Sequence, residues 1–90
     1  MKNHTSYVWC LEYSNDGLYL ASGSADKSVI IWDSQKIEYI KKINFSHQVY
    51  NLKYQPNSKN LAVGLYNAGI QILDEEHQKI FDLDHNLNNL

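Results

Sequence analysis

The sequence predicts an all-β fold made of two four-stranded antiparallel units, and three observations favour it. Short runs of β-branched, aromatic and aliphatic residues alternate with clusters of turn residues along the chain. No segment shows the 3.6-residue periodicity of an amphipathic helix. The order of runs and turns also occurs twice, which indicates two copies of one structural unit.

Each unit is expected to contain four strands joined by tight turns. The strands expected in the first unit span residues 7–13, 18–22, 28–32 and 36–45, and those in the second span residues 49–54, 60–64, 69–73 and 78–83. The first turn, Ser14-Asn15-Asp16-Gly17, consists of residues that tolerate positive φ. The fourth run alternates apolar residues with lysines, apart from Ile40, which is out of phase. This alternation predicts an outer, half-exposed strand.

The repeat has a constant spacing. Identical residues recur 41 positions apart, and examples are Val8 and Val49, Tyr13 and Tyr54, Leu20 and Leu61, Gly23 and Gly64, and Asp33 and Asp74. A period near 40 that holds four short strands is typical of a propeller blade rather than a helical solenoid. We therefore assign residues 1–47 to the first unit and 48–84 to the second. Residues 85–90 are interpreted as a tail or the start of a third unit.

The first unit also carries a set of spaced motifs. They are His4, the turn Asn15-Asp16-Gly17, the run Leu20-Ala21-Ser22-Gly23-Ser24, Asp26, and the run Val29-Ile30-Ile31-Trp32-Asp33. These residues and their spacing resemble the WD-repeat β-propeller family, and the likeness covers about two repeats. The resemblance implies two four-stranded antiparallel blades of a partial, open propeller.

The resemblance implies a buried hydrogen-bond network in the first unit, formed by His4, Ser22, Asp26 and Trp32. The residue types are compatible with it, since a carboxylate accepts, a hydroxyl can bridge and an indole N–H only donates. In the second unit His47 is kept, but apolar or amide residues replace the other three members. They are Val63, Asn67 and Leu73. We therefore expect the second unit to lack the network.

The resemblance also implies a surface where partners dock, at the opening formed by the start of each innermost strand. By position this surface holds Tyr7, Trp9 and Ala25 from the first unit, and Gln48, Tyr50 and Tyr66 from the second. Trp and Tyr are enriched at interface hot spots. We therefore predict partner binding by Tyr7, Trp9, Tyr50 and Tyr66. The alternative is that these rings pack between blades.

These features predict a protein-interaction scaffold without catalytic activity. Its expected partners are other proteins, subunits of a complex, or further propeller blades from the same or another chain. One alternative is an enzyme or enzyme accessory propeller that uses His4 and Asp26 as acid and base. A catalytic triad with Ser22 is disfavoured, because Ser22 lies inside an expected strand without a nucleophile elbow. Another alternative is a truncated gene product without an independent function.

Composition and charge disfavour nucleic-acid binding, membrane insertion and metal binding. The 90 residues are 43% hydrophobic and carry a net charge of -2, so no basic stripe is available for nucleic acid. No run approaches the roughly 20 apolar residues of a membrane span. The four histidines lack the spacing of metal ligands, and we expect no metal and no cofactor. Cys10 is the single cysteine, which favours an intracellular location, in the cytoplasm or nucleus.

Two blades alone leave two sheet faces without a neighbour. A closed propeller typically uses about four to eight blades. We therefore expect this chain to be part of a longer propeller, or to complete one by associating with other copies or chains.

Overall fold

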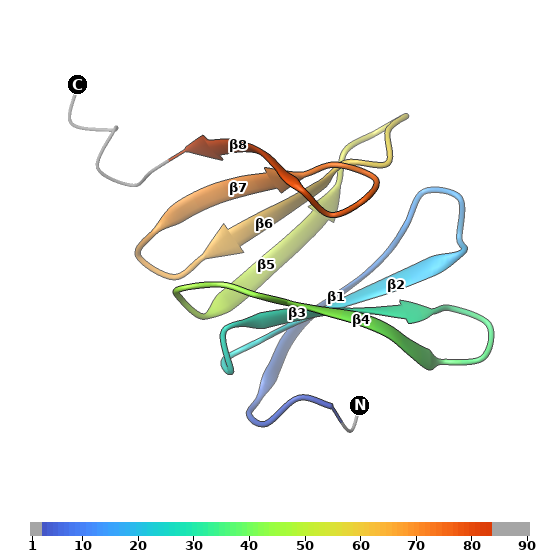
Figure 1. Ribbon diagram of the computed structural model, residues 1–90, viewed down its shortest axis with the longest axis horizontal. Coiled ribbons are helices and arrows are strands. Elements are labelled where there is room, and N and C mark those ends of the chain that lie inside the picture. Colours follow the sequence, from blue (N-terminus) through green and yellow to red (C-terminus); the bar gives the residue numbers. More distant parts are fainter. Residues whose placement is uncertain (1–2, 84–90) are drawn as a thin grey trace.

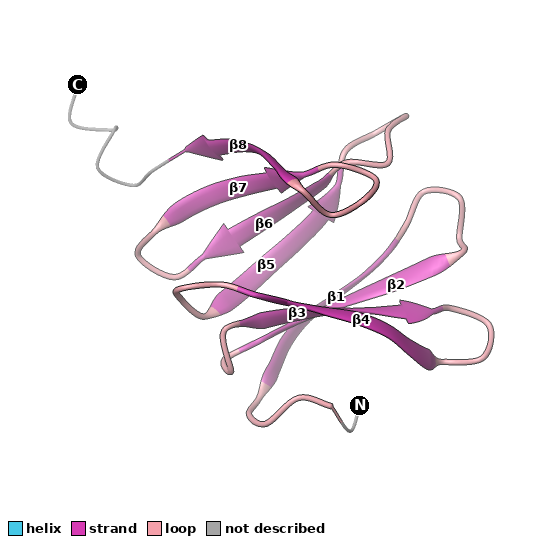
Figure 2. Ribbon diagram, viewed as in Figure 1, coloured by secondary structure: helices cyan, strands magenta, loops and turns pink. Residues whose placement is uncertain are grey.

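The computed structural model describes residues 3–83, and within this range every regular element is a strand (Figure 2). Two antiparallel sheets have the strand orders β1-β2-β3-β4 and β5-β6-β7-β8. The first contains β1 (Val8–Tyr13), β2 (Tyr19–Ser24), β3 (Ser28–Asp33) and β4 (Glu38–Asn44). The second contains β5 (Val49–Tyr54), β6 (Leu61–Leu65), β7 (Gly69–Leu73) and β8 (Lys79–Leu83). The prediction of an all-β chain with two open four-stranded blades is confirmed.

The predicted unit boundaries stay a prediction, although one sheet lies within each of the ranges 1–47 and 48–84. Residues 85–90, interpreted as a tail or the start of a third unit, lie outside the described range.

Strands β5 and β7 have the expected bounds, and the other six differ from the sequence prediction by one or two residues at one or both ends. Two of these differences have local physical reasons. The second strand extends to Ser24 instead of ending at Ser22, because Ser24 pairs with Val8 across the sheet. The fourth strand begins later than expected, at Glu38, because the preceding Ile37 has a φ of 53° in the turn. A register shift between β3 and β4 leaves Ile40 as an extra residue in β4. This β-bulge explains why Ile40 is out of phase.

The two blades pack through β5, which lies against β1 and β2 (Figure 1). The core between them contains Ala21, Val29 and Ile31 from the first blade, and Val49, Leu52, Tyr54, Leu61, Val63, Leu65 and Leu73 from the second. A Cβ on Gly23 would lie 2.5 Å from Val49 Cγ1 and 2.7 Å from Cys10 Sγ. Glycine at position 23 therefore permits the close approach of the two sheets.

Cys10 is half-buried and packs against this core, and its thiol donates a long hydrogen bond to the Gly23 carbonyl (3.8 Å). On the other face of the first sheet, Leu20, Ile30 and Trp32 form a second, smaller cluster. The molecule is a flat slab of 45 × 31 × 17 Å. On the face of the first sheet that points away from the second blade, Leu20, Ile30 and Trp32 are buried, whereas the β1 residues Leu11 and Tyr13 are exposed.

Candidate functional site

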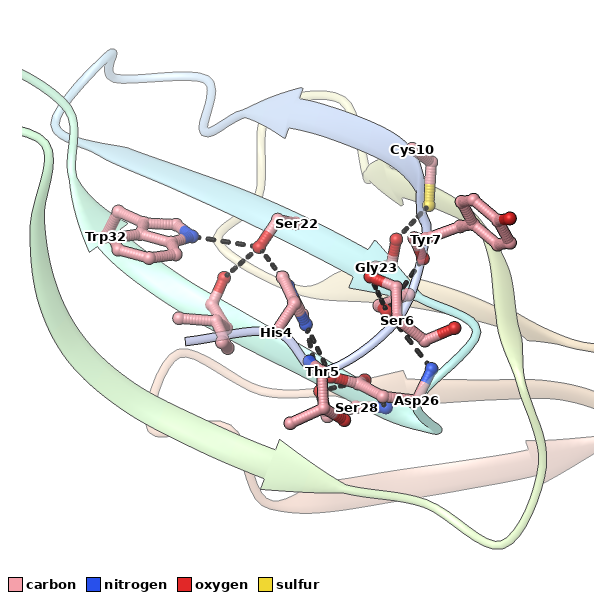
Figure 3. Close-up of polar contacts among 12 residues, drawn as sticks. His4, Thr5, Ser6, Tyr7, Cys10, Ser22, Gly23, Asp26, Ser28 and Trp32 are labelled. Carbon is pink, nitrogen blue, oxygen red and sulfur yellow. Dashed lines mark hydrogen bonds and ion pairs between the residues drawn. The ribbon is translucent and has the colours of Figure 1, made fainter. Parts of the chain in front are cut away.

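A run of hydrogen bonds joins Trp32, Ser22, His4 and Asp26 (Figure 3). Trp32 Nε1 donates to Ser22 Oγ at 2.8 Å, and Ser22 Oγ lies 2.7 Å from His4 Nε2. His4 Nδ1 lies 3.0 Å from Asp26 Oδ2. Since a carboxylate only accepts and an indole N–H only donates, we assign the proton on Nδ1 to the bond with Asp26, and Nε2 as the acceptor from Ser22. Every member of the run is then satisfied.

Asp26 is held by donors from two segments. The Thr5 amide donates to Oδ2 at 2.9 Å, while the Ser28 amide and hydroxyl donate to Oδ1 at 3.1 and 2.5 Å. Burial alone would raise the pKa of the Asp26 carboxyl. The hydrogen bonds from Ser28, Thr5 and His4 outweigh it and hold that pKa well below its ordinary value. The carboxylate thus fastens the segment before β1 to the β2–β3 turn.

Three polar residues around Asp26 were missed by the sequence analysis. They are Thr5, Ser24 and Ser28; the Ser24 hydroxyl donates to the Tyr7 carbonyl at 2.7 Å and accepts from the Asp26 amide at 3.1 Å. A sequence signal for two of them existed. Ser24 and Ser28 lie two residues before and after Asp26, which is the spacing of turns closed by side-chain hydrogen bonds.

The network is closed to solvent. The His4 and Asp26 side chains are 1% and 4% exposed, and Ser22 is fully buried. No substrate can therefore contact these groups in this conformation. Their hydrogen bonds instead connect an N-terminal segment, a turn and two strands of the first blade.

The second blade replaces this polar arrangement with apolar packing. Val63 and Leu73 are buried in the core between the blades. The turn before β7 also has a different backbone, with positive φ at Asn67 and Gly69, whereas the first blade has it at Lys27. The predicted loss of the network is consistent with these contacts.

His47 does not take the place of His4. The Tyr66 amide donates to the Gln48 carbonyl, just as the Ala25 amide donates to that of Tyr7. Gln48 thus corresponds to Tyr7. Three residues before each of them stand Phe45 in the second blade and His4 in the first, so Phe45, not His47, is the equivalent of His4. Phe45 packs against the core, whereas His47 is exposed and contacts the Ser46 hydroxyl at 2.8 Å.

An aromatic hollow lies at the end of the slab where β1 and β5 begin. Its lining residues are Trp9, Gln48, Tyr50, Tyr66 and Asn67. Trp9 and Tyr50 are both bulge residues, since the pairing skips from Val8 to Cys10 in β1 and from Val49 to Asn51 in β5. Because a bulge redirects the side chain of the extra residue, the same irregularity brings both rings to this hollow.

Three of the four residues predicted to bind a partner thus line one hollow: Trp9, Tyr50 and Tyr66. Each of these rings is more than half exposed. Tyr7 is not part of the lining, but its ring lies 5.9 Å from that of Trp9 at 46°. Asn67 belongs to the lining and was not among the predicted residues. The lining contains no acidic or basic side chain.

A second cavity of about 680 Å³ lies at the opposite end of the seam between the blades, among the β1–β2, β5–β6 and β7–β8 turns. Burial raises the pKa of Tyr54, which lines it, to about 12. Burial, together with the nearby Lys41 ammonium, lowers the pKa of His77 in the same lining. The buried Nδ1 of His77 has no hydrogen-bond partner among residues 3–83.

Within residues 3–83, no cluster of three potential ligands could hold a metal ion. The same part of the chain has no helix that could cross a bilayer.

Comparisons with known proteins agree with this architecture. Residues 1–33 match the family model described as WD domain, G-beta repeat. The intraflagellar transport protein 122 homolog of Xenopus tropicalis is 45% identical over 62 residues, which cover 69% of this chain and 5% of that protein. The transcription factor unc-37 of Caenorhabditis elegans is 32% identical over 83 residues, or 92% of this chain and 14% of that protein. The chain thus spans only a small part of the length of these curated relatives.

Two solved structures share the fold. One is described as the structure of U3-55K, with a TM-score of 0.83, and the other as the crystal structure of RRP9 WD40 repeats, with a TM-score of 0.84. Both are 25% identical to this chain, and each superposition covers 90% of this chain and 25% of the other.

Proposed function

We propose that this WD-repeat chain, an open pair of β-propeller blades, is a protein-interaction platform without catalytic activity, and that its docking surface is the aromatic hollow. One observation carries the proposal: both blades use a bulge at the same position to direct an exposed ring, Trp9 or Tyr50, into one shared hollow. Large aromatic side chains at the centre of a contact supply much of the binding energy in protein interfaces.

The chemistry of the hollow favours a particular kind of partner. Its rings are exposed, and its polar groups are neutral amides and phenols, from Gln48, Asn67 and the tyrosines. Such a lining fits a protein segment that inserts an apolar or aromatic side chain and offers backbone hydrogen bonds at the rim. It lacks the charged side chains that would select an acidic or basic segment.

The burial of His4 and Asp26 argues against the alternative of acid–base catalysis by these residues. A catalytic acid or base must come within hydrogen-bond reach of the group that it protonates or deprotonates. Both side chains are almost completely shielded from solvent, and their hydrogen bonds hold the blade together. We therefore assign them a structural role.

Selection from a displayed peptide library tests the proposal. Peptides selected on the wild-type chain should bind at least about 30-fold more weakly to the double variant Trp9→Ala, Tyr50→Ala, which corresponds to the loss of about 2 kcal/mol typical of a hot spot. The matched control is Tyr19→Ala, since Tyr19 is an exposed ring outside the hollow. Far-UV circular dichroism checks that all variants stay folded. Peptides that bind wild type and double variant equally would contradict the proposal.

A further inference from the structure

Two surfaces meet where the blades pack together, one from each blade. The first, here called the docking edge, is formed by Val49, Leu52 and Tyr54 of β5. The second, the receiving face, is formed by Ala21, Gly23, Val29 and Ile31 of β2 and β3. Both sides are buried because they contact each other inside the chain.

The first blade carries a second docking edge that nothing in the described chain covers. Val8, Leu11 and Tyr13 repeat Val49, Leu52 and Tyr54 at the 41-residue spacing, with the same residue types and a bulge at the same place. The exposed fractions are 38%, 54% and 59% in the first blade, but 0%, 4% and 6% in the second. One set of side chains is therefore buried at an interface, while its copy is open to solvent.

The second blade carries a second receiving face. Ala62, Gly64, Ile70 and Ile72 correspond to the four residues of the buried receiving face, and strand alternation places them on the side away from the first blade. The comparison of the two glycines is informative. A Cβ on Gly23 would collide with Val49 of the other blade, whereas a Cβ on Gly64 would meet only Asn51 and Tyr50 of its own blade. Gly64 thus leaves the backbone uncovered by a side chain, as Gly23 does for β5, but within the described chain no strand of another blade packs on it.

We propose that a second copy of this chain docks head to tail, with the open docking edge of one copy on the open receiving face of the next. The chain already makes this contact once internally, with the same three docking residues. The contact is heterologous, because the docking edge of one copy meets the receiving face of the next. Further copies can therefore be added until the ends meet and form a ring. A ring of about four to eight blades corresponds to two to four copies. This proposal is independent of the aromatic hollow.

Sedimentation velocity over a hundred-fold range of concentration tests the assembly. The wild-type chain should reach the mass of two to four copies of the 10.5-kDa chain. Leu11→Glu places a charge on the open docking edge, and Ile70→Glu places one on the open receiving face. Each variant should sediment as a monomer, because a buried unpaired carboxylate is strongly unfavourable. Ile37→Glu, an equally exposed residue in the β3–β4 turn, should assemble like wild type.

Mixing the two variants separates this contact from unspecific aggregation. Leu11→Glu keeps an intact receiving face, and Ile70→Glu keeps an intact docking edge. An equimolar mixture should therefore form a dimer that cannot grow, with twice the mass of one chain. A symmetric contact, in which both copies use the same surface, could not be rescued in this way.

Gly64→Ala is a milder variant that tests the same face if a charged variant fails to fold. Its Cβ requires Asn51 to shift by only a few tenths of an ångström, so the circular dichroism spectrum should be unchanged while association weakens at least tenfold. A wild-type chain that is monomeric at every concentration would overturn the proposal. So would an oligomer that is unaffected by Leu11→Glu and Ile70→Glu.

Discussion

Replacing Trp32 by Phe should destabilise the first blade by about 1–3 kcal/mol, the sum of one lost hydrogen bond and a smaller buried ring. Trp32 is 5% exposed and donates to Ser22 Oγ at 2.8 Å. The net value of such a bond is about 0.5–1.5 kcal/mol. Ser22 keeps its contact with His4, so no buried group is orphaned, and a phenyl ring can retain the edge-on contact with Tyr39.

Urea unfolding followed by far-UV circular dichroism, at one fixed protein concentration, measures the loss. A double-mutant cycle of Trp32→Phe with Ser22→Ala isolates the hydrogen bond, and its coupling energy should exceed about 0.5 kcal/mol. The matched control is Leu73→Ala, at the corresponding position of the second blade. Leu73 is buried among apolar side chains, so its truncation should cost about 2–5 kcal/mol through packing alone.

Leu73→Ala should show no coupling to Ser22→Ala, because Ser22 faces away from the second blade. A coupling energy below about 0.3 kcal/mol between Trp32→Phe and Ser22→Ala would refute the idea that the network stabilises the first blade.

Two further predictions concern the contact between the blades and the hydrogen-bond network of the first blade. Gly23→Ala should lower the free energy of unfolding by about 1–3 kcal/mol, since its Cβ would lie 2.5 Å from Val49 Cγ1, and a urea midpoint equal to that of wild type would contradict this. The pKa of Asp26 is lowered by folding, so its contribution to stability is complete above the ordinary value of 3.8 and is lost as the pH falls below it. Asp26→Asn should therefore be less stable than wild type at neutral pH and show a shallower acid decline, which thermal melts over a pH series measure; parallel acid curves would exclude this role.

Much of the hydrogen-bond network could be predicted from sequence, because its residues occur at the spacings of a recognisable motif. The motif around Ser22, Asp26 and Trp32 is local, and the family resemblance supplied His4 from outside it. Thr5 was missed because its contact with Asp26 is a backbone amide, which any residue could provide. The correspondence of Phe45 with His4 was also missed, since His47 has the matching residue type but occupies the backbone position of Ser6.

By itself, the sequence determined the strands, their turns and the 41-residue repeat, because alternation and turn chemistry act over a few neighbouring residues. Only the tertiary structure decided in which of the two blades each repeated surface is buried. Tyr13 and Tyr54 end equivalent strands with equivalent local sequence, but Tyr13 is 59% exposed and Tyr54 is 6% exposed. The difference comes from the first blade, which covers β5 but leaves the matching face of β1 open.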